Sequence, residues 1–275
     1  MLSNDKNDVC VIAQISDLHI CEPGKKFNDT HDTTANLENC IESINDLEPS
    51  PDFVLATGDL ADKPSIKSYM VLKTLLGRLN MPYYMMPGNH DDREIFRVSF
   101  PECNYLDSKS QFFSYCIEGY PLRVIALDTL DPDTGEAFLC ETRLEWLEKA
   151  LNGNASKPTL LAMHHQPLLT RLGLKDTGFA FKGAKELKAL ISQHPQVKWV
   201  TCGHLHRQII FSLGQVPVTV APSATCIRTL TINNDMPKEF VNEPPAYLVF
   251  IWHPKLGVVC HNNLIGDFGP PQPMR

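Results

Sequence analysis

The sequence predicts an α/β protein in which two mixed β-sheets pack together between flanking helices. In the first half, short apolar β-like runs alternate with amphipathic helical repeats, the rhythm of parallel βαβ units with right-handed crossovers. From residue 209 onward, short β-like runs separated by turn residues replace that rhythm. The chain has 275 residues, 43% of them hydrophobic, and no linker-like tract divides it. It is long enough for a large core, so we expect a single domain spanning residues 1–275.

The first half is expected to contain three strands and two helices. Apolar runs that stop at polar or glycine residues predict strands at residues 10–15, 53–56 and 81–86. Apolar residues at helical spacing predict helices over residues 37–47 and 66–79, each preceded by residues suited to start a helix. Parallel strands end at the same edge of a sheet, so the polar residues that follow them should lie together.

The middle of the chain continues the pattern, with one exception. Residues 168–182 have no clean periodicity and contain two glycines, so we expect a long loop beside the site, as a lid or specificity element. The other expected elements are strands at residues 111–117, 122–127, 159–162 and 197–201 and helices at 142–151 and 187–191.

The last part of the chain is expected to be β-rich. Four short runs are expected to be antiparallel strands, at residues 209–211, 216–220, 247–252 and 257–261. We expect residues 207–275 to form a C-terminal extension of the second sheet.

Charge and cysteine usage limit the classes of partner and the compartment. A net charge of −7 argues against a broad basic surface for nucleic acid or anionic membranes. The polar residues 1–8 and the short apolar run after them fit neither a signal peptide nor a membrane span. Nine cysteines lie singly, without a CxxC pair, which favours unbridged thiols and a cytoplasmic protein. A homodimer is the oligomer expected from base rates.

Five polar clusters, each at the end of a β-like run, predict a metal site. They combine imidazole nitrogens with carboxylate and amide oxygens, a donor set that suits Mn, Fe, Co, Ni or Zn. Seven such groups are too many for one four-coordinate ion, whereas two ions sharing a carboxylate would use them all. The clusters are Asp17-Leu18-His19, Gly58-Asp59, Gly88-Asn89-His90-Asp91, His164-His165 and Gly203-His204-Leu205-His206.

The order of these clusters resembles the signature of the calcineurin-like metallophosphoesterases. All five blocks are present in order between residues 17 and 206. The resemblance implies a four-layer αββα sandwich and two divalent or mixed-valence ions of Mn, Fe, Zn or Co. Carried over block by block, it implies the following ligands: Asp17, His19 and His206 on one metal, Asn89, His164 and His204 on the other, and Asp59 bridging the two.

The same resemblance implies a catalytic role for His90, with Asp91 as the partner that orients it. A metal-bridging hydroxide would attack the phosphorus in line, and His90 would protonate the leaving alkoxide or stabilise the charge. Asn89, His90, His165 and Arg207 are the expected substrate contacts, although His165 also suits a structural role and Arg207 a solvated one.

Further features resemble bacterial class III cyclic nucleotide phosphodiesterases and their glycerophosphodiesterase relatives. They include Asp91-Asp92 after His90, Trp146-Leu147 before His164, and Pro222-Ser223-Ala224-Thr225 after the last block. Some glycerophosphodiesterases carry an extra histidine near the Thr225 position, where this chain has Cys226. We therefore expect hydrolysis of small phosphodiesters, first of all 3′,5′-cyclic nucleotides such as cyclic AMP.

Several alternatives stay open. Glycerophosphodiesters are the next substrates to consider, followed by phosphomonoesters in a broad phosphoesterase. A nuclease is disfavoured because the acidic chain lacks a basic track. A non-catalytic scaffold on the same fold is disfavoured because none of the ligand positions is lost.

Overall fold

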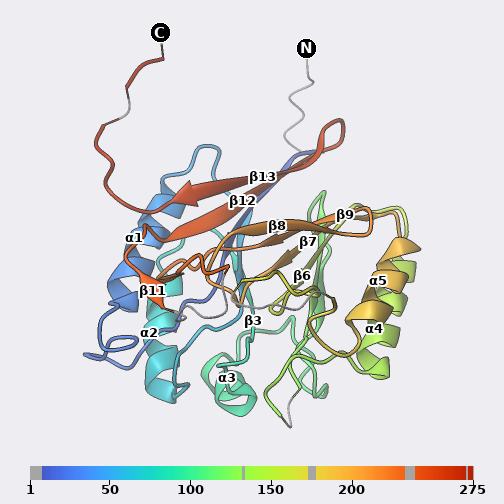
Figure 1. Ribbon diagram of the computed structural model, residues 1–275, viewed down its shortest axis with the longest axis horizontal. Coiled ribbons are helices and arrows are strands. Elements are labelled where there is room, and N and C mark those ends of the chain that lie inside the picture. Colours follow the sequence, from blue (N-terminus) through green and yellow to red (C-terminus); the bar gives the residue numbers. More distant parts are fainter. Residues whose placement is uncertain (1–7, 132–133, 173–177, 233–238, 271, 275) are drawn as a thin grey trace.

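The fold consists of two packed sheets with helices on both outer sides (Figure 1). The structure is a computed structural model that describes residues 8–131, 134–172, 178–232, 239–270 and 272–274. Helices α1 (Thr33–Asn45) and α2 (Ile66–Leu76) pack on the first sheet, and α4 (Glu141–Gly153) and α5 (Ala184–Ser192) pack on the second. The expected αββα layering is confirmed.

The first sheet has the strand order β13-β12-β1-β2-β3. Strands β1, β2 and β3 are parallel, whereas β12 and β13 run antiparallel to their neighbours. The strands are β1 (Cys10–Ile15), β2 (Phe53–Thr57), β3 (Tyr83–Met86), β12 (Ala246–His253) and β13 (Gly257–Leu264).

The second sheet has the strand order β4-β5-β6-β7-β9-β8. Its central strands β5, β6, β7 and β9 are parallel, and an antiparallel strand closes each edge. The strands are β4 (Tyr115–Ile117), β5 (Arg123–Leu127), β6 (Thr159–Met163), β7 (Val197–Cys202), β8 (Ile209–Leu213) and β9 (Val216–Val220).

Both faces of the central strands are buried. In β1, Ala13 and Ile15 face the helices, while Ile12 packs between the two sheets against residues such as Val124. Such two-sided burial explains why these strands are continuous apolar runs in the sequence. The described helices are each too short or too polar to span a bilayer. All nine cysteines are free thiols, as expected.

The expected placement of residues 207–275 is wrong for its second half. Strands β8 and β9 do extend the second sheet, but β12 and β13 join the first. Strand β12 pairs with the free edge of β1, with Ile12 opposite Phe250. An apolar pattern identifies a strand but not its partner, and β2 occupies only one of the two edges of β1.

Three short elements do not follow from sequence periodicity: α3 (Arg93–Ser99), β10 (Ile227–Arg228) and β11 (Phe240–Val241). Strands β10 and β11 pair with each other, and among the described residues they form a separate two-stranded ribbon. In the expected loop 168–182, Leu168 bridges to Phe179 and Lys182 to Phe138, while residues 173–177 lie outside the described part. The proposed lid role of that loop stays a prediction.

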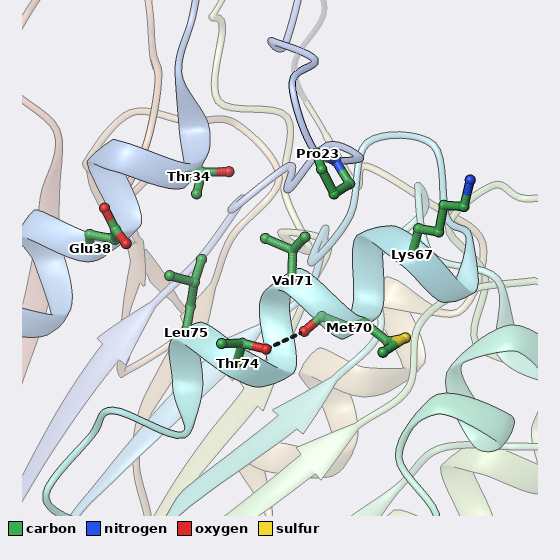
Figure 2. A pocket seen from close by; sticks show the side chains of 8 residues that line it. All are labelled: Pro23, Thr34, Glu38, Lys67, Met70, Val71, Thr74 and Leu75. Atoms are coloured by element: carbon green, nitrogen blue, oxygen red, sulfur yellow. Dashed lines mark hydrogen bonds between the residues drawn. The ribbon is translucent and has the colours of Figure 1, made fainter.

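A surface groove separates α1 from α2 (Figure 2). Its volume is about 460 Å³, and Val71, Leu75 and the exposed Met70 give it a largely apolar lining. Thr74 Oγ1 donates a hydrogen bond to the backbone oxygen of Met70 at 2.9 Å, so this hydroxyl is satisfied within the helix. The groove contains none of the histidines of the strand-end clusters.

Candidate metal centre

The loops after β1, β2 and β7 hold the predicted ligands in an unusual backbone conformation. Asp17, His19, Asp59, His204 and His206 have φ values of 54°, 44°, 51°, 75° and 55°. Positive φ is uncommon for residues with a side chain and tends to occur at functional sites. Each loop therefore turns sharply at the strand end, which brings its polar side chains to the edge shared by both sheets.

The first group of side chains consists of Asp17, His19, Asp59 and His206. All four are buried, and their ligand atoms lie within 4.8 Å of one another. The Nε2 atoms of His19 and His206 face each other at 3.0 Å. Asp17 Oδ1 lies 3.6 Å from His206 Nε2, and Asp59 Oδ2 lies 3.6 Å from His19 Nε2. These atoms surround one small volume from opposite sides.

The second group lies on the other side of Asp59. Asn89 Oδ1 is 3.1 Å from His164 Nε2 and 2.8 Å from His204 Nδ1. Asp59 Oδ1 is 3.3 Å from His164 Nε2, while its other oxygen faces His19. The carboxylate of Asp59 therefore lies between the two groups, with one oxygen toward each.

Backbone carbonyls fix the orientation of two of the imidazoles. His164 Nδ1 lies 2.7 Å from the Thr57 oxygen, and His206 Nδ1 lies 3.0 Å from the Cys226 oxygen. Because a carbonyl only accepts, Nδ1 must carry a proton in each ring, and Nε2 is the nitrogen that faces the other donors. Metal-ligating histidines are commonly oriented in this way.

Burial and neighbouring charges set the protonation of the cluster. Burial, with the adjacent His164, lowers the pKa of His204 to about 3, and burial also lowers the pKa of His19. Burial disfavours charge on Asp59 and His164 too, but their mutual attraction prevails: it lowers the pKa of Asp59 and raises that of His164 to about 9. Neutral imidazoles beside a carboxylate are the forms that bind metal.

Glycines make room for this arrangement. A Cβ atom on Gly203 would collide with Ser16 Oγ, and one on Gly88 would collide with the carboxylate and backbone nitrogen of Asp59. These two positions therefore require glycine, because the backbone there passes too close to neighbouring atoms to leave room for a side chain. Together, the donor types and their convergence fit two metal ions.

The predicted contact between His90 and Asp91 is wrong. His90 Nδ1 lies 3.2 Å from the backbone oxygen and 3.6 Å from the carboxylate of Asp62. The ring of His90 is 40% exposed and stands edge-on to that of His19, with centroids 4.7 Å apart. Asp62 was not among the predicted site residues, although its position three residues after Asp59 on the same loop was a usable signal.

Asp91 instead stabilises the loops that carry the ligands. Its buried carboxylate accepts hydrogen bonds of 2.8–3.2 Å from four donors. These donors are the backbone N–H groups of Leu60, Ala61 and Gly88 and the hydroxyl of Tyr69.

The two remaining predicted substrate contacts differ in their position. His165 is buried beside His164 and His204, and its Nδ1 lies 2.9 Å from Thr129 Oγ1, so it belongs to the wall of the second group. Arg207 is already engaged, since its guanidinium donates to the Arg228 backbone oxygen at 2.7 Å and to Glu243 at 2.8 Å. The guanidinium of Arg207 is therefore not free to bind the substrate.

Comparisons with known proteins agree with this geometry. The calcineurin-like phosphoesterase model matches residues 10–208. The probable glycerophosphodiester phosphodiesterase GpdQ of Arcobacter nitrofigilis is 34% identical over 263 residues, which is 96% of each chain. The 3′,5′-cyclic-nucleotide phosphodiesterase alr5338 of Nostoc sp. is 30% identical over 232 residues, covering 82% of this chain and 84% of that protein.

Among solved structures, a dimetal phosphatase from Danio rerio superimposes with a TM-score of 0.60 at 13% identity, covering 94% of this chain and 99% of that one. At that identity the likeness supports the fold alone. The family match spans all five ligand-bearing loops, and a relative above 30% identity extends over nearly the whole sequence. This chain belongs to the calcineurin-like phosphoesterase family.

Proposed function

We propose that this protein is a metal-dependent phosphodiesterase that hydrolyses small phosphodiesters, with 3′,5′-cyclic nucleotides such as cyclic AMP as the first candidate substrates. The observation that carries the proposal is the position of Asp59, whose two oxygens face two separate groups of donors. Asp17, His19 and His206 would hold one ion, and Asn89, His164 and His204 the other, with Asp59 shared. When bound, the two ions would supply an activated water and orient the phosphoryl oxygens.

The chain's own residues would provide the proton for the leaving group. His90 is more exposed than the buried ligands and stands next to His19. Its Nδ1 faces Asp62, which would hold the ring in place. The proton on the other ring nitrogen, Nε2, would then be given to the departing alkoxide.

The relatives support two substrate classes. One is named for cyclic nucleotides and the other for glycerophosphodiesters. GpdQ of Arcobacter nitrofigilis has the higher sequence identity and coverage of the two relatives. Its similarity makes glycerophosphodiesters the alternative substrates. Mn, Fe, Zn and Co all suit the mixed nitrogen and oxygen donors. The nine free thiols support a reducing, cytoplasmic setting.

The test is hydrolysis by metal-stripped protein that has been reconstituted with Mn²⁺. Cyclic AMP and glycerophosphoethanolamine are the substrates, and an activated bis-aryl phosphodiester reports competence. We expect cleavage of the activated diester and of cyclic AMP. If the activated diester and glycerophosphoethanolamine are cleaved but cyclic AMP is not, glycerophosphodiesters replace cyclic nucleotides as the proposed substrates. No cleavage of any diester by fully metal-loaded protein would refute the proposed function.

A further inference from the structure

The β10–β11 ribbon lies directly beside the first group of metal-binding side chains. The backbone N–H of Arg228 in β10 donates to the His206 oxygen at 3.4 Å. In β11, the ring of Phe240 lies 5.2 Å from the ring of His206. Arg228 and Phe240 are paired directly across the ribbon, so their side chains project from the same face. That face is the one toward the metal centre.

Phe240 belongs to an aromatic wall that continues from the ligands to the surface. Phe27 is buried and packs against His19, with the two rings tilted by 32° and their centroids 4.7 Å apart. Phe240 meets Phe27 edge-on at 5.1 Å and His31 at 5.7 Å. Phe27 therefore supports the ligands from behind, whereas Phe240 and His31 are only partly buried and remain accessible at the rim.

Arg228 differs from its neighbour Arg207 in the partners that the described residues offer to its guanidinium. Arg207 is held by Glu243, as described above. Within the described residues, neither a carboxylate nor a hydrogen-bond acceptor contacts the guanidinium of Arg228, although this side chain is partly buried. A partly desolvated guanidinium without a counter-ion favours binding of an anion or another strong acceptor.

We infer that the β10–β11 ribbon recognises the part of the substrate that does not react. Phe240 and His31 take a flat heterocyclic ring by stacking, and Arg228 binds an acceptor on the phosphate or on that ring. The substrate class is then a phosphodiester of a nucleoside-like alcohol rather than of an aliphatic alcohol such as glycerol. This inference rests on the proposed function for its substrate, but the ligand preference is measurable without turnover.

The test compares binding of two phosphate compounds to the Mn²⁺-loaded protein by calorimetry: adenosine 5′-monophosphate and sn-glycerol 3-phosphate. Stacking on an aromatic side chain is worth about 1–3 kcal/mol per base, so we expect the wild type to prefer the adenosine compound by about tenfold or more. Phe240→Leu should remove most of this preference. Phe240→Tyr keeps the ring and serves as the matched control, which should retain it. Arg228→Gln should weaken binding of both compounds.

Two results would overturn the inference. One is equal affinity of the wild-type protein for the two compounds. The other is a Phe240→Leu variant that binds both compounds more weakly by the same factor, because this would assign Phe240 to the support of His206 alone. Metal content measured on each variant shows whether a weaker preference for the adenosine compound results from loss of the metal centre. A ring preference in binding together with no diester hydrolysis would refute the proposed function and leave the inference intact.

Discussion

The metal centre and the β10–β11 ribbon are neighbours, yet they are built in different ways. The centre draws its side chains from the ends of β1, β2, β3, β6 and β7, with positive φ at most ligands and close glycine contacts. The ribbon consists of two residues in each strand, pairs with no other strand, and places one aromatic and one cationic side chain at the rim. Changes in the ribbon therefore disturb far fewer contacts than changes in the centre.

This difference predicts separate roles for the metal centre and the ribbon. Replacing a residue of the centre should affect catalysis for every substrate, because each ligand loop is locked to the others by buried contacts. Replacing Phe240 should alter which substrate is preferred, and replacing Arg228 should weaken binding of each substrate.

Asp59→Asn should abolish activity. An amide in this position removes the negative charge shared by both donor groups and places an N–H group against one of them. We expect turnover of the activated diester to fall by at least about 1,000-fold, since loss of an outer-shell partner alone costs about 10–100-fold. Steady-state kinetics with excess Mn²⁺ would measure this. Full activity of the variant would show that Asp59 does not bridge.

His90→Ala should depress turnover without removing the metals. A positioned general acid contributes about 100- to 10,000-fold, so kcat for cyclic AMP should fall in that range. The activated diester has a better leaving group that needs less protonation, and its hydrolysis should fall less. Metal analysis of the same preparation provides the control. An equal loss on both substrates would argue against a role in leaving-group protonation.

Metal binding should strengthen with pH. His164 has its pKa raised to about 9 by Asp59, so in the metal-free protein it carries a proton below that pH and must lose it to bind an ion. The apparent affinity should therefore rise by about tenfold per pH unit between about pH 7 and 9 and level off above. Calorimetry in buffers of different ionisation enthalpy would report the released proton. Affinity that is constant across this range would contradict the assigned protonation.

Asp62 and Asp91 should respond differently to the same change. Asp62→Asn loosens the support of His90, and we expect a roughly tenfold lower kcat with little change in thermal stability. Asp91→Asn instead sets an amide N–H group against two of the four donors, at a cost of about 1–3 kcal/mol in unfolding free energy. Kinetics and thermal melts of both variants make the comparison. A large loss of kcat confined to Asp91→Asn would restore it as the partner of His90.

The groove between α1 and α2 provides the smallest expected effect (Figure 2). Met70 is 61% exposed there, so Met70→Ala removes little buried surface. We expect activity and metal content within about twofold of the wild type and a stability change below about 0.5 kcal/mol. A marked loss of hydrolysis would connect this groove to the reaction.

The sequence predicted which side chains gather at the strand ends, because each of them is tied to a local signal. An apolar strand that ends at a glycine and a polar ligand residue identifies the position, and parallel topology brings such ends together. The Asp59 and His164 assignments needed no knowledge of distant packing. The residue that faces His90 depended on which way two loops turn, and three of the four donors that hold Asp91 come from other segments.

Other features depended on contacts that periodicity does not encode. The sequence pattern of β12 and β13 predicts strands but does not identify their partners. They join the first sheet because β12 pairs with the free edge of β1. Phe240 lies in a two-residue strand, too short for a pattern, and approaches His206 only through the fold. Arg228 and Arg207 look equivalent in sequence, but Arg207 is held by Glu243 and by the backbone oxygen of Arg228.

The most direct test of a dinuclear centre is the number of metal ions bound per chain. Protein stripped with chelator, reconstituted with Mn²⁺ and dialysed should contain two ions per chain by elemental analysis, one for each donor group around Asp59. His204→Ala should retain the ion held by Asp17, His19 and His206 and lose the other. One ion or none in the reconstituted wild-type protein would contradict a dinuclear centre and the reaction proposed for it.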